Sequence, residues 1–118
     1  MLVWNEYDFV ECLGVLPEVG DYETSHFYKV EKEGLRLELK VEQYDGDIHI
    51  ELFREGLEPS VFYMRMLDCP GARYVRDYGR DYLELAATKS FGNRYDGESV
   101  IPFGVRLTVT PHIRIELF

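Results

Sequence analysis

The sequence lacks the marks of an exported or membrane protein. No apolar run approaches the roughly 20 residues that a membrane-spanning helix requires. The first residues, MLVWNEYDFVEC, carry acids where a signal peptide carries basic residues. Only two cysteines are present, Cys12 and Cys69, and without an export signal we expect both to be reduced, partly buried thiols. These absences predict a cytoplasmic protein.

Motifs with a known chemistry are also missing. The sequence has no phosphate-binding glycine loop, no nucleophile elbow, no His-Glu-x-x-His and no Cys-x-x-Cys. Cys69 precedes Pro70, and nothing near it in the sequence would activate a nucleophile. We therefore assign no catalytic residue, no metal and no cofactor, and the sequence favours binding over catalysis.

One arrangement leaves a metal site open as an alternative. His49 and Glu51 lie two residues apart on one predicted strand, and His112 and Glu116 share a face of another. If those strands were neighbours, two imidazoles and two carboxylates could gather around a metal ion. Because coordination needs at least three convergent ligands, we favour the simpler interpretation that both pairs are solvated polar faces.

Chain length and net charge indicate the number of domains and the class of partner. The 118 residues, of which 46% are hydrophobic, suit one folded domain spanning residues 1–118. The net charge is −9, and residues 1–59 hold fifteen acidic against five basic side chains. An acidic surface repels nucleic-acid phosphates and attracts basic proteins, so we expect a basic protein partner, no nucleic acid and no membrane. The alternative is that acidity only keeps a small domain soluble.

The best-defined structural pattern is a β-hairpin over residues 35–53. Apolar and polar residues alternate on both sides of Asp45-Gly46-Asp47, which predicts two strands with one buried and one solvated face. The buried face would contain Leu35, Leu37, Leu39, Val41, Ile48, Ile50 and Leu52.

Flanking segments give a helix and further strands. We expect a helix from about Asn5 to Leu13, with Asn5 as its N-cap and Gly14 at its end. Trp4 would pack on this helix or on the sheet rather than serve as a ligand platform. A loop over residues 17–21 and a strand over residues 24–32 follow.

The next strand, residues 60–67, is apolar or aromatic on both faces, which predicts a central strand or one whose second face is covered. After a loop at residues 90–97, the closing segment, residues 100–118, alternates on both sides of Pro111. A proline there indicates an edge strand, a bulge or a break between two strands.

Residues 73–88 fit two patterns. Alternating Leu83, Leu85 and Ala87 favour strands with a turn near Gly79, whereas the Asp81 and Glu84 spacing is that of a helical capping box. We favour strands. Three arginines alternate with tyrosines here and could bind an anion or a nucleic acid, but we expect them to pair with acids of the first half. They are Arg73, Arg76 and Arg80.

Together these patterns predict an α+β domain, a curved, mainly antiparallel sheet of about six or seven strands with one N-terminal helix packed on it. The favoured function is an acidic protein-binding module, such as an immunity or inhibitor protein that neutralises a basic partner. The partner-facing residues would be Tyr44, Asp45, Asp47 and Glu51.

Two other functions remain open. One is a small-ligand or metal-dependent protein whose pocket on the curved sheet is lined by Tyr63 and Arg65. The other is a subunit that pairs with a second copy through the edge of the final strand, which ends at Phe118.

Overall fold

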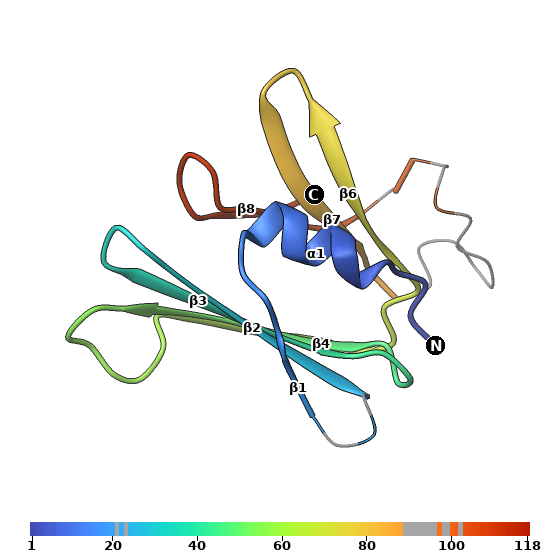
Figure 1. The fold of residues 1–118 in the computed structure, drawn as a ribbon, viewed down its shortest axis with the longest axis horizontal. Coiled ribbons are helices and arrows are strands. Elements are labelled where there is room, and N and C mark those ends of the chain that lie inside the picture. Colours follow the sequence, from blue (N-terminus) through green and yellow to red (C-terminus); the bar gives the residue numbers. More distant parts are fainter. Residues whose placement is uncertain (21, 23, 89–96, 98–99, 102) are drawn as a thin grey trace.

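Two antiparallel sheets, each built from consecutive strands, make up the computed structural model (Figure 1). The structure describes residues 1–20, 22, 24–88, 97, 100–101 and 103–118. The first sheet contains β1 (Glu18–Val19), β2 (Ser25–Lys32), β3 (Leu35–Glu42), β4 (Asp47–Arg54) and β5 (Phe62–Met66) in that order. The second contains β6 (Ala72–Asp77), β7 (Arg80–Ala86), β8 (Gly104–Thr108) and β9 (Arg114–Leu117).

The predicted α+β class is confirmed, with an antiparallel architecture and one helix among the described residues. The strands of the described residues number nine and form two sheets where we expected one curved sheet. The chain leaves the first sheet after β5 and turns at residues 68–71 before β6 begins, so no hydrogen-bonded ladder joins β5 to β6.

The helix, α1 (Glu6–Leu13), begins and ends where the sequence predicts. Asn5 caps it by accepting a 3.0 Å hydrogen bond from the backbone N–H of Tyr7. Gly14 closes it in the left-handed conformation, with φ of 73°. Phe9 is fully buried and packs on the ring of Tyr28 in β2, while α1 also contacts β6 and β7. In Figure 1, α1 therefore crosses the front of the molecule between the two sheets.

A single buried cluster joins both sheets and α1. In the β3–β4 hairpin, Leu37, Leu39, Val41, Ile48 and Ile50 are at most 1% exposed, as their alternation predicts. The second sheet contributes Leu83, Leu85, Val105 and Leu107, which are equally buried. The turn of the hairpin lies slightly earlier than expected: Glu42 pairs with Asp47, so residues 43–46 form the turn and Asp47 begins β4.

The N-terminal residues fasten the two sheets together where the chain passes between them. Val3 forms a parallel bridge with Gly71, donating to the carbonyl of Pro70 and accepting from the N–H of Ala72. Leu2 donates a 2.8 Å hydrogen bond to the carbonyl of Gln43 in the hairpin turn. The first residues thus lie beside the turn of the β3–β4 hairpin.

Two strand predictions were wrong. The strand at residues 60–67 is neither central nor covered: β5 forms an edge, and Val61, Tyr63 and Leu67 are each more than half exposed. On the other face of β5, Phe62 and Met64 pack against the core, so one buried face attaches this strand to the domain. The expected loop at residues 17–21 contains β1, which is too short for its alternation to be seen in the sequence.

Two open choices are resolved. The strand alternative holds for residues 73–86, which lie in β6 and β7 and the turn between them, whereas Ala87 lies beyond β7; Tyr78 and Gly79 in the turn have positive φ. Pro111 marks a break between two strands, β8 and β9, and β9 forms an edge of the second sheet. The predicted loop at residues 90–97 lies outside the described residues except for Gly97.

Candidate functional site

The predicted partner-facing residues divide between the hairpin turn and the strand beyond it. Tyr44 is 55% exposed and Asp45 is exposed in the turn, while Asp47 is partly buried at the start of β4. Glu51 lies four residues further along β4, about 13 Å away, facing Tyr63 of β5. We call residues 42–47 the hairpin tip, and three of the four predicted residues belong to it.

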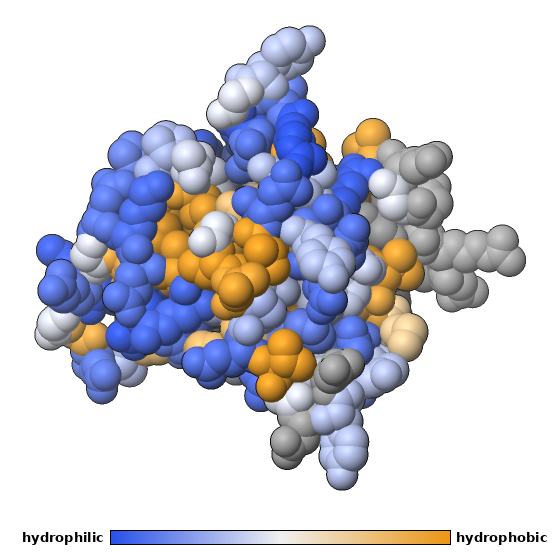
Figure 2. All heavy atoms as spheres, viewed as in Figure 1, coloured by the Kyte–Doolittle hydropathy of each residue, from blue (hydrophilic) through white to orange (hydrophobic). Residues whose placement is uncertain are grey.

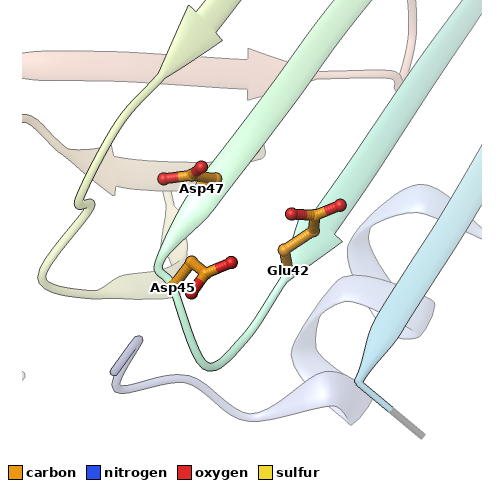
Figure 3. Close-up of side chains that lie close together, drawn as sticks. All are labelled: Glu42, Asp45 and Asp47. Atoms are coloured by element: carbon orange, nitrogen blue, oxygen red, sulfur yellow. The ribbon is translucent and has the colours of Figure 1, made fainter. Parts of the chain in front are cut away.

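Three carboxylates gather at the hairpin tip, those of Glu42, Asp45 and Asp47 (Figure 3). Their nearest oxygens lie within 4.8 Å of one another. Asp47 accepts hydrogen bonds from Arg65 at 3.3 Å and from the backbone N–H of Asp68 at 3.2 Å. Glu42 pairs with Lys40 at 3.2 Å.

Asp45 is thus the one carboxylate of the three with no ion pair among the described residues. Calcium takes six to eight oxygen ligands, and these three side chains supply only part of such a set. We interpret the hairpin tip as a concentrated patch of negative charge.

The alternative metal site is not formed. His49 and Glu51 lie on β4 of the first sheet, whereas Glu116 lies on β9 of the second. His112 has its Nδ1 2.7 Å from a carboxylate oxygen of Glu33. Glu116 accepts hydrogen bonds from two arginines, so these four side chains do not converge.

A row of alternating charges crosses the second sheet. Arg73, Glu84, Arg106 and Glu116 occupy paired positions on β6, β7, β8 and β9. Glu84 is 4% exposed and accepts from Arg73 at 2.8 Å and from Arg106 at 3.0 Å. Arg106 also donates to Glu116 at 3.2 Å.

This row corrects the expected pairing of the arginines. Of these three arginines, only Arg76 pairs with a described acid of the first half, Glu11 of α1. Arg73 pairs instead with Glu84, its direct cross-strand neighbour on β7, and Arg80 reaches Glu116 on β9 of the same sheet at 3.7 Å. The hydrogen bond from Arg106 also lowers the pKa of Glu116, so this carboxylate stays ionised at neutral pH and keeps its arginine partners occupied within the sheet.

A hollow beside α1 was not predicted. It has a volume of about 710 Å³. Its lining residues are Trp4, Asn5, Glu6, Tyr7, Val19, His26 and Gln43. We call it the N-terminal hollow, and it brings together α1, β1, β2 and the hairpin turn.

His26 and Glu6 link the two walls of this hollow. His26 is 3% exposed on the core face of β2, and its Nε2 lies 2.8 Å from Oε2 of Glu6. Trp4 packs edge-on against Phe9 and His26, with ring centroids 4.9 and 5.0 Å away. Trp4 therefore packs on helix and sheet as predicted, and it also lines a hollow. The sequence signal was a histidine in register with Tyr28 and Val30 on a buried face.

Two smaller hollows lie elsewhere. One, of about 370 Å³, borders the β2–β3 turn and the end of β4 and is lined mostly by charged residues. The other, of about 320 Å³, adjoins the hairpin tip and includes Tyr44 and Asp45. Tyr63 and Arg65, which we expected to line a ligand pocket, are exposed on the edge strand β5 and belong to none of these three hollows.

Comparison with known proteins identifies a similar fold. No family model matches the sequence, and no curated protein matches it. The structure is similar to a chain of a contact-dependent growth inhibition toxin–immunity protein complex from Klebsiella pneumoniae 342. The TM-score is 0.73 with 14% sequence identity, over 97% of this chain and 92% of that chain. At this identity the likeness shows the fold.

Within the part of the chain that the structure describes, no helix is long and apolar enough to cross a membrane.

Proposed function

We propose that this chain is a non-catalytic, acidic protein-binding module that neutralises a basic protein partner in the cytoplasm, as an immunity protein does. The observation that carries the proposal is the similarity, over 97% of the chain, to a chain of a toxin–immunity protein complex. A fold alone does not define a function, so the surface must supply the rest of the argument.

The distribution of charge supports a basic partner. Residues 1–59, with a balance of −10, supply α1 and strands β1 to β4, so the acidic side chains belong to one part of the fold. Fields of this kind accelerate encounter with a positively charged protein and disfavour other partners. Because four of the five arginines on its strands pair with its own carboxylates, the second sheet offers a weaker field of the opposite sign.

The hairpin tip has the composition of a recognition surface. Tyr44 is exposed beside Asp45, whose carboxylate has no ion pair among the described residues, and tyrosine is enriched among the residues that dominate binding energy. Asp47 and Glu51 extend the negative charge along β4. We therefore propose Tyr44, Asp45, Asp47 and Glu51 as partner-facing residues.

The first experiment is purification of the tagged chain from its own cells at low and high salt, followed by mass spectrometry of the bound proteins. The proposal predicts one basic partner that binds at low salt and is lost at high salt. A toxin–immunity complex contains two kinds of chain, so each gene is then expressed alone. The partner should arrest growth and this chain should not; arrest by this chain would contradict the proposal.

The hairpin tip is tested by Asp45→Asn. We expect about a two- to fivefold loss of affinity at low salt, which disappears at high salt, since an exposed charge contributes roughly 0.5–1 kcal/mol. Glu55→Gln, an exposed acid at the opposite end of the hairpin, is the matched control. Equal affinities for both variants would remove Asp45 from the interface.

Asp47→Asn is a poorer test. Because Asp47 accepts from Arg65 and from the backbone N–H of Asp68, its substitution should also lower the free energy of unfolding.

A further inference from the structure

The surface formed by α1 and β1 carries negative charge without any compensating base of its own. The chain contains no lysine or arginine before Lys29. The described acids of this stretch are Glu6, Asp8, Glu11 and Glu18. Among the described lysines and arginines, Arg76 forms an ion pair with one of these acids, Glu11. A positively charged partner therefore meets a field of one sign here.

The same surface exposes apolar and aromatic side chains. Tyr7 is 72% exposed, Leu16 82% and Val19 50%. Figure 2, which shows this side of the molecule, has apolar surface around the segment that leads from α1 to β1, bordered by hydrophilic residues. An apolar and tyrosine-bearing centre inside a charged rim is the usual anatomy of a protein–protein interface.

The N-terminal hollow lies within this surface and presents a fixed carboxylate. Glu6 is half exposed, and His26 holds its Oε2 at 2.8 Å while His26 itself is buried. Among the described residues, Oε1 of Glu6 has no hydrogen-bond partner. The Nδ1 of His26, a side chain that also lines the hollow, has none either. The site thus combines a positioned carboxylate acceptor and an indole beside a buried histidine whose Nδ1 has no partner among the described residues.

We propose that the N-terminal hollow receives an arginine side chain of the basic partner. This inference rests on the proposed function. The guanidinium would donate to Oε1 of Glu6 and lie against the indole of Trp4, since arginine pairs well with both carboxylates and aromatic rings. A volume of about 710 Å³ lies within the range of about 300–1,000 Å³ found for small-ligand sites.

The hollow adjoins the hairpin tip through Gln43. Gln43 lines the hollow and opens the turn that contains Tyr44 and Asp45. Leu2, next to the lining residues, bonds to the carbonyl of Gln43. One partner can therefore contact the hairpin tip and place an arginine in the N-terminal hollow at the same time.

The test measures affinity for the purified basic partner by calorimetry, using Glu6→Gln and Asp8→Asn. Both variants remove one charge from the first turn of α1, but only Glu6 lines the hollow. In Glu6→Gln the side-chain amide oxygen can still accept from His26, so the helix should stay docked. We expect Glu6→Gln to weaken binding at least tenfold and Asp8→Asn less than threefold; equal losses would mean that only net charge matters and would overturn the inference.

A second measurement needs no variant. Trp4 is the single tryptophan of the chain, so labelling with 5-fluorotryptophan gives one fluorine resonance that reports on the hollow. The inference predicts that adding the partner shifts this resonance, and an unchanged resonance in the saturated complex overturns it. If binding is salt-dependent and Asp45→Asn weakens it while both hollow tests fail, only this inference falls. If no basic partner exists, both proposals fall.

Discussion

Burial changes the chemistry of Cys12 and Cys69. Burial raises the pKa of each thiol to about 12, so neither forms a thiolate at neutral pH. Cys69 also donates from its Sγ to the carbonyl of Gly71 at 3.4 Å. Both cysteines are free, as the sequence predicts, and they are more completely buried than expected.

This burial predicts low reactivity towards thiol reagents. At pH 8 the native protein should react with a disulfide reagent such as Ellman's at least a hundredfold more slowly than the chain in guanidinium, because reaction requires opening of the core. The reaction is followed by absorbance, with the denatured chain giving two equivalents as the control. Rapid release of one equivalent from native protein would show that one thiol is accessible.

Some of these residue contacts could be predicted from the sequence and others could not. Asn5 and Gly14 were predictable because a cap acts on neighbours in the chain. The contact between His26 and Glu6 was not, because it joins residues twenty positions apart and depends on how α1 lies against β2. Local signals define an element's ends, while long-range contacts define the candidate site.

Between elements, the charged row of the second sheet makes stability depend on pH. The pKa of Glu116 is lowered by the hydrogen bond from Arg106, and the nearby Arg114 and Arg80 also lower it. The folded state therefore prefers the carboxylate, and this stabilisation is complete above the ordinary pKa of about 4.5 and lost as the pH falls through the lower folded-state value.

Glu116→Gln should therefore lower the free energy of unfolding at pH 7 and reduce its further loss below about pH 4.5. Urea unfolding at pH 7 and pH 3.5 measures both effects. Glu31→Gln removes an exposed acid that, among the described residues, pairs with Lys29 alone; it is the matched control and should change neither the stability at pH 7 nor its pH dependence strongly. An unchanged pH dependence in Glu116→Gln would show that the row does not contribute.

The pairing of β7 with β8 depends on Gly104. A Cβ at this position would lie 2.0 Å from the carbonyl oxygen of Leu85, so the strands would have to separate. Gly104→Ala should therefore reduce the free energy of unfolding by about 3 kcal/mol or more. Gly56→Ala, at positive φ but in open space, should cost about 1 kcal/mol. Similar losses for the two variants in urea titrations would contradict the close approach.

Strand alternation predicted most elements but not how they assemble. The period-two pattern of residues 35–53 identified β3 and β4 and their buried faces, because it follows directly from strand geometry. The same reasoning failed for β5, whose second apolar face is exposed, because an apolar residue on a surface leaves the same pattern as a buried one. The division into two sheets depends on the turn at residues 68–71, which alternation does not describe.

At the scale of the whole molecule, the fold places most of the acid on α1 and the first sheet. The negative charge of residues 1–59 was visible in the sequence, and so was the exposed acidic turn at Tyr44 and Asp45. The N-terminal hollow was not, because it gathers residues 4–7, 19, 26 and 43 from four segments. That the chain is one domain stays a prediction, which the buried cluster shared by both sheets supports.

Association of two copies through β9 also stays a prediction. β9 forms one edge of the second sheet, so it has unpaired backbone groups, but Arg114 and Glu116 on this strand disfavour pairing with an identical edge.

The most direct test of the proposed function is a growth assay with the basic partner recovered by purification. Cells carry the partner under one inducible promoter and this chain under another. The account predicts that the partner alone arrests growth, that this chain restores it, and that a variant combining Glu6→Gln with Asp45→Asn restores it less. Growth arrest that persists with wild-type chain at levels sufficient to bind all the partner would contradict neutralisation as the function.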